Sequence, residues 1–404
     1  MWAGRAVRTC AAGCRASALS RHCNFKRRSF SAIKQPPSAA QGSVVRAWDD
    51  LGIHSGGRLR VDLPSSCISV HAQSQWTDDL KASLVSTNGE QSCSPSDLIC
   101  VTADATAQTC SITAAAGESL SGHELHLVLP ESFGLWVHVN EGKLTTTGKL
   151  KGDIHLRTDS GDIQVATIRG ETVCLAAPHG SIAADTLEGG ITIECTTATV
   201  KKLLSNGARI SAAGDVAIGG MYDAHALIEC PASVTVDSSH GHVEVRGGAR
   251  EVRLLGVSGS AAVSAGGDVQ LNFDALQDGS RSEVATSDGS VSVSAPEDAS
   301  CTVDVAAGDV KIATAAFKGE TSVTTASGTI AGAAPEPSRH GGGGKIDMQG
   351  AREQRLNTFV SGDRQRASGN MKSETALHIR APNGSVVLET LGWMDRIKRK
   401  HGFL

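Results

Sequence analysis

The chain has 404 residues, of which 40% are hydrophobic and only 3% aromatic, with 45 glycines and a formal net charge of −4. Its length allows more than one domain. No apolar run approaches the roughly 18 residues of a membrane-spanning helix, and a slightly acidic balance excludes a protein that binds nucleic acid through an extensive basic surface.

The first segment of the chain has the composition of a targeting sequence. Residues 1–48 contain nine Lys or Arg, several Ser and Ala, and no Asp or Glu. This composition is typical of a mitochondrial transit peptide, and the apolar core of a secretory signal is absent. Arg28 lies three residues before Ser31, a spacing that predicts cleavage after Phe30. We therefore expect the mature protein in the mitochondrion, in the matrix; a basic tail without a targeting role is the alternative.

Cleavage at this point changes the charge balance. The transit peptide, residues 1–30, holds seven of the 38 basic residues and none of the 42 acidic ones, so the remainder carries 31 − 42 = −11. Backbone binding to nucleic acid depends on clustered Lys and Arg, so we expect no nucleic-acid partner. Residues 31–56 are interpreted as a linker.

Residues 57–147 are predicted to form a β-rich cap. Apolar and polar residues alternate at 58–63, 67–70, 123–129 and 135–139. This alternation is the pattern of strands with one buried face. Such a region can shield the open end of a repeat array, whose terminal units are expected to be atypical.

A short phrase recurs from residue 148 onward: Gly, usually Asp or Ser, then Ile or Val, any residue, and Val, Ile or Leu. Gly adopts positive φ without steric cost and Asp or Ser bonds nearby backbone, so each phrase begins with a turn. The next residues alternate as in a strand. In the unit that ends at Val165, Ile163 and Val165 should point inward and Gln164 outward. The structural turn glycines are Gly152, Gly161, Gly180, Gly214, Gly241, Gly267, Gly289, Gly308, Gly328 and Gly384.

The spacing of the turns indicates the architecture. Turn glycines fall nine or ten residues apart between positions 152 and 190, and 19 to 22 apart between positions 267 and 328. This spacing predicts coils of about 20 residues. Each coil is one turn of the chain and consists of two or more short strands, which bury their apolar faces by stacking on the neighbouring coils. The expected fold is all-β: a single-stranded right-handed β-solenoid over residues 148–332. An antiparallel β-sandwich has similar strand spacing and is the alternative.

The remaining chain divides into three segments. Residues 333–373 are rich in Gly and Pro and are expected to be a flexible insertion. Residues 374–390 return to the strand pattern and are predicted to form a final repeat. Residues 391–404 form a basic tail, which we expect to dock on the last coil; contact with an anionic lipid surface is the alternative.

Aspartates recur in the turn phrases, and their chemistry has three interpretations. Acidic residues in a β-helix can bind calcium or serve as the paired carboxylates of a glycoside hydrolase. The nine-residue calcium repeat is absent, however, and residues 148–332 contain only three aromatic rings to hold a sugar. We therefore expect turn formers at Asp153, Asp162, Asp215, Asp268 and Asp309.

Histidine and cysteine patterns give no motif for a metal or redox centre. His123 and His126 are three apart on a strand and face opposite sides, whereas His240 and His242 share a face but make only a weak ligand pair. No two of the 11 cysteines form a CxxC pair. No catalytic, cofactor-binding or metal-binding residue is predicted. Three cysteines are expected to act as small buried hydrophobes: Cys174, Cys195 and Cys301.

The turn phrases at 158–163 and 286–293 resemble the repeats of the putative-adhesin family of β-solenoid domains of unknown function. The resemblance covers residues 57–332 and 374–390. The family is widespread in bacteria and includes an uncharacterised vertebrate member, which this chain with its mitochondrial-type leader resembles. The resemblance implies a β-solenoid and no catalytic residues, because the family supplies none to transfer.

The function expected from the sequence is that of a non-enzymatic scaffold. It would bind one or more proteins along its strand faces or through residues 333–373. An extracellular or surface adhesin is the alternative, and a carbohydrate-active enzyme on a β-helix is the third hypothesis. The sequence identifies neither the partner nor the oligomeric state.

Overall fold

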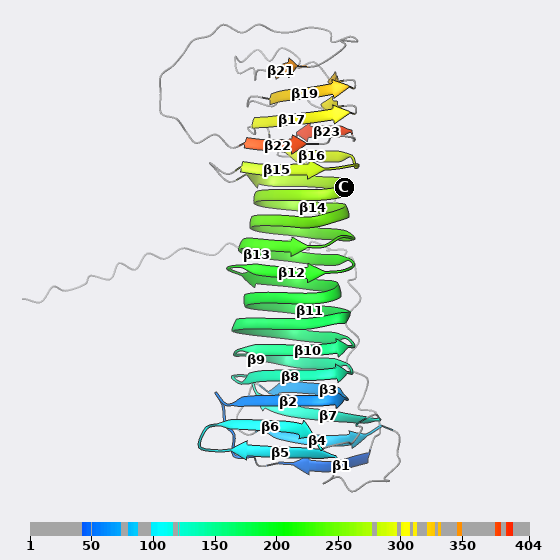
Figure 1. The fold of residues 1–404 in the computed structure, drawn as a ribbon. Coiled ribbons are helices and arrows are strands. Elements are labelled where there is room, and N and C mark those ends of the chain that lie inside the picture. The colour runs from blue at the N-terminus through cyan, green and yellow to red at the C-terminus, as the bar shows by residue number, and fades with distance from the viewer. Residues whose placement is uncertain are drawn as a thin grey trace, which may run out of the picture. The chain divides into compact units, whose positions relative to one another are not determined.

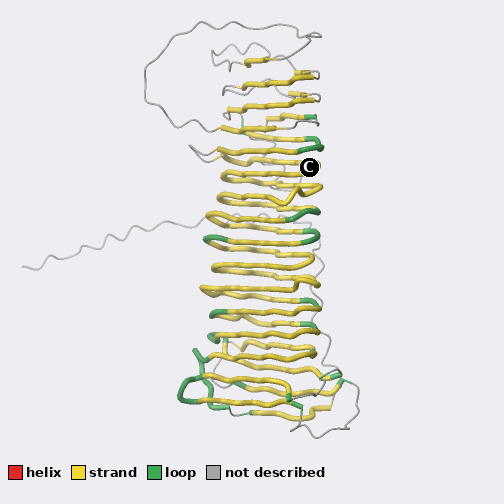
Figure 2. Tube along the Cα trace, in the orientation of Figure 1, coloured by secondary structure: helices red, strands yellow, loops and turns green. Residues whose placement is uncertain are grey.

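The computed structural model describes residues 43–49, 51–73, 80–87, 98–115, 120, 122–276, 281–296, 300–307, 310–312, 321–327, 330–332, 346–349, 376–380 and 385–390. Every regular element in these ranges is a β-strand (Figures 1 and 2). Among the same residues, no helix has the length and apolar character to cross a membrane. The predicted transit peptide and its cleavage site lie outside these ranges.

The central part of the described chain is a stack of parallel strands. Successive coils pair in register, and the paired residues of neighbouring coils lie 17 to 22 positions apart in sequence. Figure 1 shows the coils following one another in chain order from β8 to β14. The strands are β8 (Gly134–Glu141), β9 (Leu144–Lys151), β10 (Ile154–Ser160), β11 (Ile163–Ser205), β12 (Ala208–Ala212), β13 (Val216–Glu229) and β14 (Ser233–Leu276).

Alternate residues of each strand fill a narrow core. Ile163 and Val165 are 1% exposed and Gln164 is half-buried on the outer face, as the repeat phrase predicts. In the next coils Val173 and Leu175 take the inner positions. Each coil buries its apolar side chains against its neighbours, which a single unit cannot do alone.

The corners of the stack bring backbone atoms very close together. A Cβ added at Gly180 would lie 1.7 Å from the carbonyl oxygen of Gly161 in the preceding coil. Gly161 itself has φ 147° and sits in the same way beneath the carbonyl of Gly142. Any side chain at these positions would force neighbouring coils apart, which explains the recurrence of Gly in the turn phrase.

At the N-terminal end, the stacking order differs from the chain order. The coil β2/β3 pairs in parallel with β6/β7 on one side and with β8/β9 on the other. Strands β1, β4 and β5 are antiparallel to their partners and cover the end of the stack (Figure 1). The strands are β1 (Ser43–Trp48), β2 (Arg58–Ser65), β3 (Cys67–Gln73), β4 (Lys81–Ser86), β5 (Ile99–Asp104), β6 (Thr109–Ala114) and β7 (His123–Pro130).

The C-terminal end shows the same interleaving. The coil β22/β23 pairs in parallel with β15/β16 and with β17/β18, so it lies between them (Figure 1). The segment predicted as the final repeat is last in sequence but internal in the stack. The strands are β15 (Arg281–Thr286), β16 (Val291–Ala295), β17 (Ser300–Ala307), β18 (Val310–Ile312), β19 (Thr321–Ser327), β20 (Ile330–Gly332), β21 (Ile346–Gln349), β22 (Ala376–Arg380) and β23 (Val386–Thr390).

These pairings make the protein an all-β, β-solenoid-like stack. The alternative β-sandwich is built of antiparallel sheets, whereas antiparallel pairs in the described chain are confined to β1, β4 and β5 with their partners. The expected boundary between cap and repeats, at 147/148, falls inside β9. Of the predicted insertion, the structure describes only β21, and the basic tail lies outside the described residues.

Candidate functional site: an arginine–tryptophan pocket on the outer face

The outer face of β2, β8 and β10 carries a row of large polar and aromatic side chains. The parallel register places Trp136 opposite Arg60 on one side and opposite His155 on the other. The strand alternation that buries Leu135 and Val137 necessarily turns Trp136 outward, where 37% of its surface is exposed. Trp136 is therefore one of the exposed large hydrophobic residues of the described chain.

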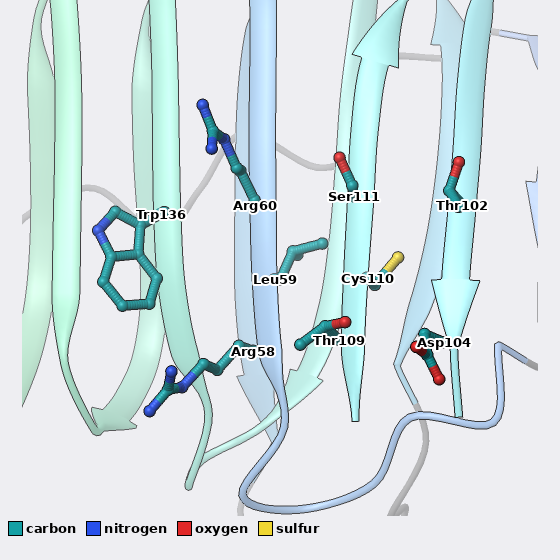
Figure 3. A pocket seen from close by; sticks show the side chains of 9 residues that line it. All are labelled: Arg58, Leu59, Arg60, Thr102, Asp104, Thr109, Cys110, Ser111 and Trp136. Atoms are coloured by element: carbon teal, nitrogen blue, oxygen red, sulfur yellow. The ribbon is translucent and has the colours of Figure 1, made fainter. Parts of the chain in front are cut away.

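This row borders a pocket of about 340 Å³, shown in Figure 3. β2, β5, β6 and β8 supply its walls, so it lies where the antiparallel strands of the N-terminal end meet the parallel stack. Two arginines and one aspartate are the charged residues of the lining. The lining consists of Arg58, Leu59, Arg60, Thr102, Asp104, Thr109, Cys110, Ser111 and Trp136.

Trp136 is held in place from both sides. Its ring stacks on the imidazole of His155, with centroids 4.9 Å apart and planes 8° from parallel. The Arg58 guanidinium carbon lies 6.0 Å from the Trp136 ring centroid, at the outer limit of a cation–π contact. The stack orders the indole before any ligand binds, which lowers the entropy cost of binding.

The pocket itself has a net positive charge. No ion pair of Arg58 is present within the described ranges, and Arg60 reaches Asp62 only at 3.9 Å. The single acidic lining residue, Asp104, uses Oδ1 to accept hydrogen bonds from the backbone N–H groups of Thr106 and Ala107. The two guanidinium groups therefore remain available to an anionic ligand.

Neighbouring carboxylates on the same face are already paired. The ring of His138 lies between Asp62 and Asp159, at 3.4 and 3.5 Å. Arg157 donates a hydrogen bond to Asp159 at 2.9 Å, and this bond is the main reason that the pKa of the Asp159 carboxyl is below its usual value. Asp159 is thus held ionised and is not suited to act as a general acid.

Two buried thiols, one of them in the pocket wall, are unreactive because of their environment. Burial raises the pKa of Cys110, in the pocket wall, to about 11, and that of Cys195 to about 12. Both remain protonated at neutral pH, whereas a nucleophilic or metal-binding Cys must be a thiolate. Cys195 is buried as predicted, Cys174 is half-buried, and the side chain of Cys301 lies outside the described part.

The repeated aspartates connect neighbouring coils. Asp162 Oδ1 accepts hydrogen bonds from the backbone N–H and the hydroxyl of Ser181 at 2.8 and 2.7 Å. Asp215 accepts the same pair of bonds from Ser233. Asp153 and Asp268 each accept one backbone N–H from the next coil. These aspartates were predicted to form turns, but each of these bonds reaches the adjacent coil rather than closing its own turn. Asp309, the fifth predicted position, lies outside the described residues.

The predicted turn glycines lie at corners of the stack wherever the structure describes them. Close backbone contacts surround most of them, and positive φ is found at Gly152, Gly161 and Gly241. Three of the ten predicted positions fall outside the described residues: Gly308, Gly328 and Gly384.

The histidines considered in the sequence contact other residues in the structure. His126 lies 3.5 Å from Glu124. His240 stacks on Tyr222, with centroids 4.8 Å apart, whereas His242 lies opposite His225. His240 and His242 therefore have different neighbours, although they share a strand.

Sequence reasoning missed the arginine–tryptophan pocket. The alternation of Arg58–Leu63 and Leu135–Val139 predicts the two strands that carry it, but not that they are neighbours. Their pairing depends on the coil β2/β3 being inserted against β8/β9. The available signal was Trp136 at an outward position of a predicted strand, in a chain with only 3% aromatic residues.

Together, the stack of parallel coils and its charged outer face define a β-solenoid-like repeat protein. The profile of the family described as Toastrack DUF4097 matches residues 75–339. The chain belongs to this family, and the resemblance to an adhesin-like family is confirmed at that level. No curated protein matches the chain.

Similar chains also occur among solved structures. A "putative lipid binding protein" from Parabacteroides distasonis is 10% identical over 77% of this chain and 98% of that chain, with a TM-score of 0.25. A "putative cell adhesion protein" from Clostridium sporogenes is 8% identical over 87% and 100%, with a TM-score of 0.17. A "putative adhesin" from Bacteroides fragilis is 11% identical over 77% and 99%, with a TM-score of 0.21.

Proposed function

We propose that the chain is a non-enzymatic scaffold that binds a protein partner through the arginine–tryptophan pocket. The observation that carries this proposal is the exposed, pre-stacked Trp136 between Arg58 and His155. Trp and Arg are among the residues that dominate the binding energy of protein interfaces. The partner that fits is an acidic segment with an aromatic or aliphatic side chain, because the pocket joins two guanidinium groups to an indole.

The net charge of the rest of the chain favours a protein ligand over nucleic acid. Without residues 1–30 the chain has a net charge of 31 − 42 = −11, so its overall electrostatic field repels a polyanion. A short acidic peptide meets only the local positive charge of the pocket. The strands that hold the pocket are paired on both sides, which supplies a rigid frame for binding.

The absence of enzymatic activity is part of the proposal. Catalytic carboxylates need one partner with a raised pKa, whereas Asp159 and Asp162 both have pKa values below the usual value because they accept hydrogen bonds. The buried thiols are protonated at neutral pH. These features support a binding role over the alternative of a β-helix carbohydrate-active enzyme.

The proposed location is the mitochondrial matrix, on the basis of the acid-free, Arg-rich segment 1–48. Sequencing of the mature N-terminus from protease-treated mitochondria tests it. A protected chain that begins at Ser31 supports import and removes the surface-adhesin alternative. An uncut chain outside mitochondria reverses this conclusion.

The proposal includes the path of the chain. We propose that the polypeptide follows a single, right-handed solenoid path. Crossover connections between parallel strands of one sheet are right-handed in about 98% of cases.

Peptides displayed on phage test the binding role directly. Panned against the full chain, the library should enrich acidic peptides with an aromatic or aliphatic side chain. The best peptide should bind the Trp136→Ala and Arg58→Ala variants at least about 30-fold more weakly, the loss of a hot-spot residue worth about 2 kcal/mol. The Tyr222→Ala variant is the control, because Tyr222 is also exposed and stacked on a histidine. A library without enrichment, or an equal loss in the control, contradicts the proposal.

A further inference from the structure

A second cluster of polar side chains lies on the outer face of β13 and β14, several coils from the pocket. His225, His242 and Glu244 each offer one ligand atom, and these atoms all lie within 4.8 Å of one another. The two imidazole centroids are 4.9 Å apart. His225 Nε2 is 3.8 Å from Glu244 Oε2, which is too long for a hydrogen bond. The three groups converge without satisfying one another.

A β-bulge places His225 in this cluster. The register of β13 against β14 shifts between Asp223 and His225, and the shift sets His225 opposite His242. Asp223 is 4% exposed, and its two carboxylate oxygens accept the backbone N–H groups of His225 and Ala208, both at 2.9 Å. Bulges of this kind re-aim a side chain beside functional sites. The position of His225 is therefore fixed by buried structure.

The corner before His242 is equally constrained. Gly241 has φ 110°, and a Cβ there would lie 1.8 Å from the carbonyl oxygen of Asp223. Only glycine lets the two coils approach at this corner. The close approach keeps His242 in register with His225 on the neighbouring strand.

Two further residues orient the converging groups. His242 Nδ1 and the Ser260 hydroxyl are 2.7 Å apart, so this hydrogen bond occupies Nδ1 and leaves Nε2 free. Arg246 donates a hydrogen bond to Glu244 Oε1 at 2.6 Å, which leaves Oε2 facing His225. Such partners behind the ligands are typical of metal sites, where they fix ring orientation and ligand basicity.

We propose that His225, His242 and Glu244 bind a divalent transition-metal ion of the zinc class. Two imidazole nitrogens and one carboxylate oxygen form a ligand set found in zinc sites with an open fourth position. Tetrahedral bonds of about 2.0–2.1 Å bring ligand atoms to about 3.3 Å from one another. Small side-chain rotations achieve this contraction, because the His225 side chain is exposed at the surface.

The local charges favour a bound cation over an ion pair alone. Glu244 brings a carboxylate to the two imidazole rings, and a metal ion binds imidazole in its neutral form. A divalent ion held by two neutral rings and a carboxylate satisfies all three groups at once. In the isolated protein, water completes the coordination at the open position.

Isothermal titration of tag-free full-length protein with zinc sulfate tests the proposal. The wild type should bind one ion that His225→Ala, His242→Ala and Glu244→Gln bind at least about 100-fold more weakly. Ser260→Ala should weaken binding by about 10- to 100-fold through the orientation of His242. His240→Ala is the matched control, because His240 is on the same strand but stacks on Tyr222. Circular dichroism of each variant checks that the strands are retained.

Cobalt substitution separates this site from the thiols. Cobalt bound by nitrogen and oxygen ligands should give visible d–d bands without the near-ultraviolet charge-transfer band of a thiolate. These bands should vanish in His242→Ala and persist in His240→Ala. A thiolate band, zinc affinity that is unchanged in the three ligand variants, or no binding to the wild type overturns the proposal.

Discussion

At the scale of single residues, glycine and aspartate have different structural roles at the corners of the stack. Glycine lets the backbones of neighbouring coils approach, as at Gly161 and Gly180. The aspartate that follows ties the coil to the next one, as Asp162 does with Ser181. The recurring Gly-Asp phrase is therefore a unit for joining coils. Its two residues have effects on stability that can be tested separately.

Gly180→Ala should destabilise the protein by about 1–3 kcal/mol, the cost of forcing extra atoms into a packed region. The added Cβ meets the carbonyl of Gly161 at 1.7 Å, and backbone cannot move aside as a flexible side chain can. The measurement is the midpoint of urea unfolding. The control is Gly207→Ala, because nothing lies within 4 Å of a Cβ at that position. Equal midpoints for the two variants would refute this account of the corner.

Asp162→Asn should lower stability at neutral pH by about 0.5–1.5 kcal/mol, the usual net contribution of a hydrogen bond. Hydrogen bonds from the hydroxyl and backbone N–H of Ser181 lower the pKa of Asp162 in the folded state. A depressed folded pKa stabilises the protein above the unfolded value of about 3.9. That contribution is lost as the pH falls through the folded pKa.

The difference between wild type and Asp162→Asn should therefore shrink below about pH 4. Urea midpoints measured from pH 7 down to pH 3 give this profile. Glu171→Gln serves as the control, because Glu171 is an exposed carboxylate of β11. A difference that stays constant with pH would assign the effect to the amide group rather than to the charge.

At the scale of elements, the sequence predicts the strands better than their neighbours. Gly-Asp phrases and alternation place the parallel coils of β10 to β14, because each corner and each buried position is encoded locally. The metal cluster was not predictable in this way. His225 lies opposite His242 only because a bulge shifts the register by one residue, and no local sequence pattern around Ala224 predicts that shift.

The arginine–tryptophan pocket illustrates the same limit. Arg58 and Trp136 are far apart in sequence and sit on strands whose periodicity is clear. Their contact requires β2 to lie beside β8 rather than beside the strand that follows it in the chain. Pairing between distant segments depends on the total burial of the stack, which a single strand pattern does not contain.

At the scale of the whole molecule, both ends of the described stack are interleaved. An early coil, β2/β3, lies between β6/β7 and β8/β9, and the late coil β22/β23 lies between β15/β16 and β17/β18. A simple solenoid adds coils in chain order and exposes its last strands, which invites pairing with other chains. Interleaving instead makes distant segments of the chain hold each end together.

Deletion of residues 376–404 tests whether the late coil holds this end. The deletion removes β22 and β23, and with them the ladder that pairs Val291 with Val386 and Val284 with Ile379. Hydrogen exchange of the amides in β15 and β16 should accelerate by at least about tenfold, a loss of about 1.4 kcal/mol in local stability. The matched control is deletion of residues 391–404 alone, which leaves both strands intact and should preserve protection. Unchanged protection in the longer deletion would mean that β17/β18 can take the place of β22/β23, and that the interleaved coil is dispensable.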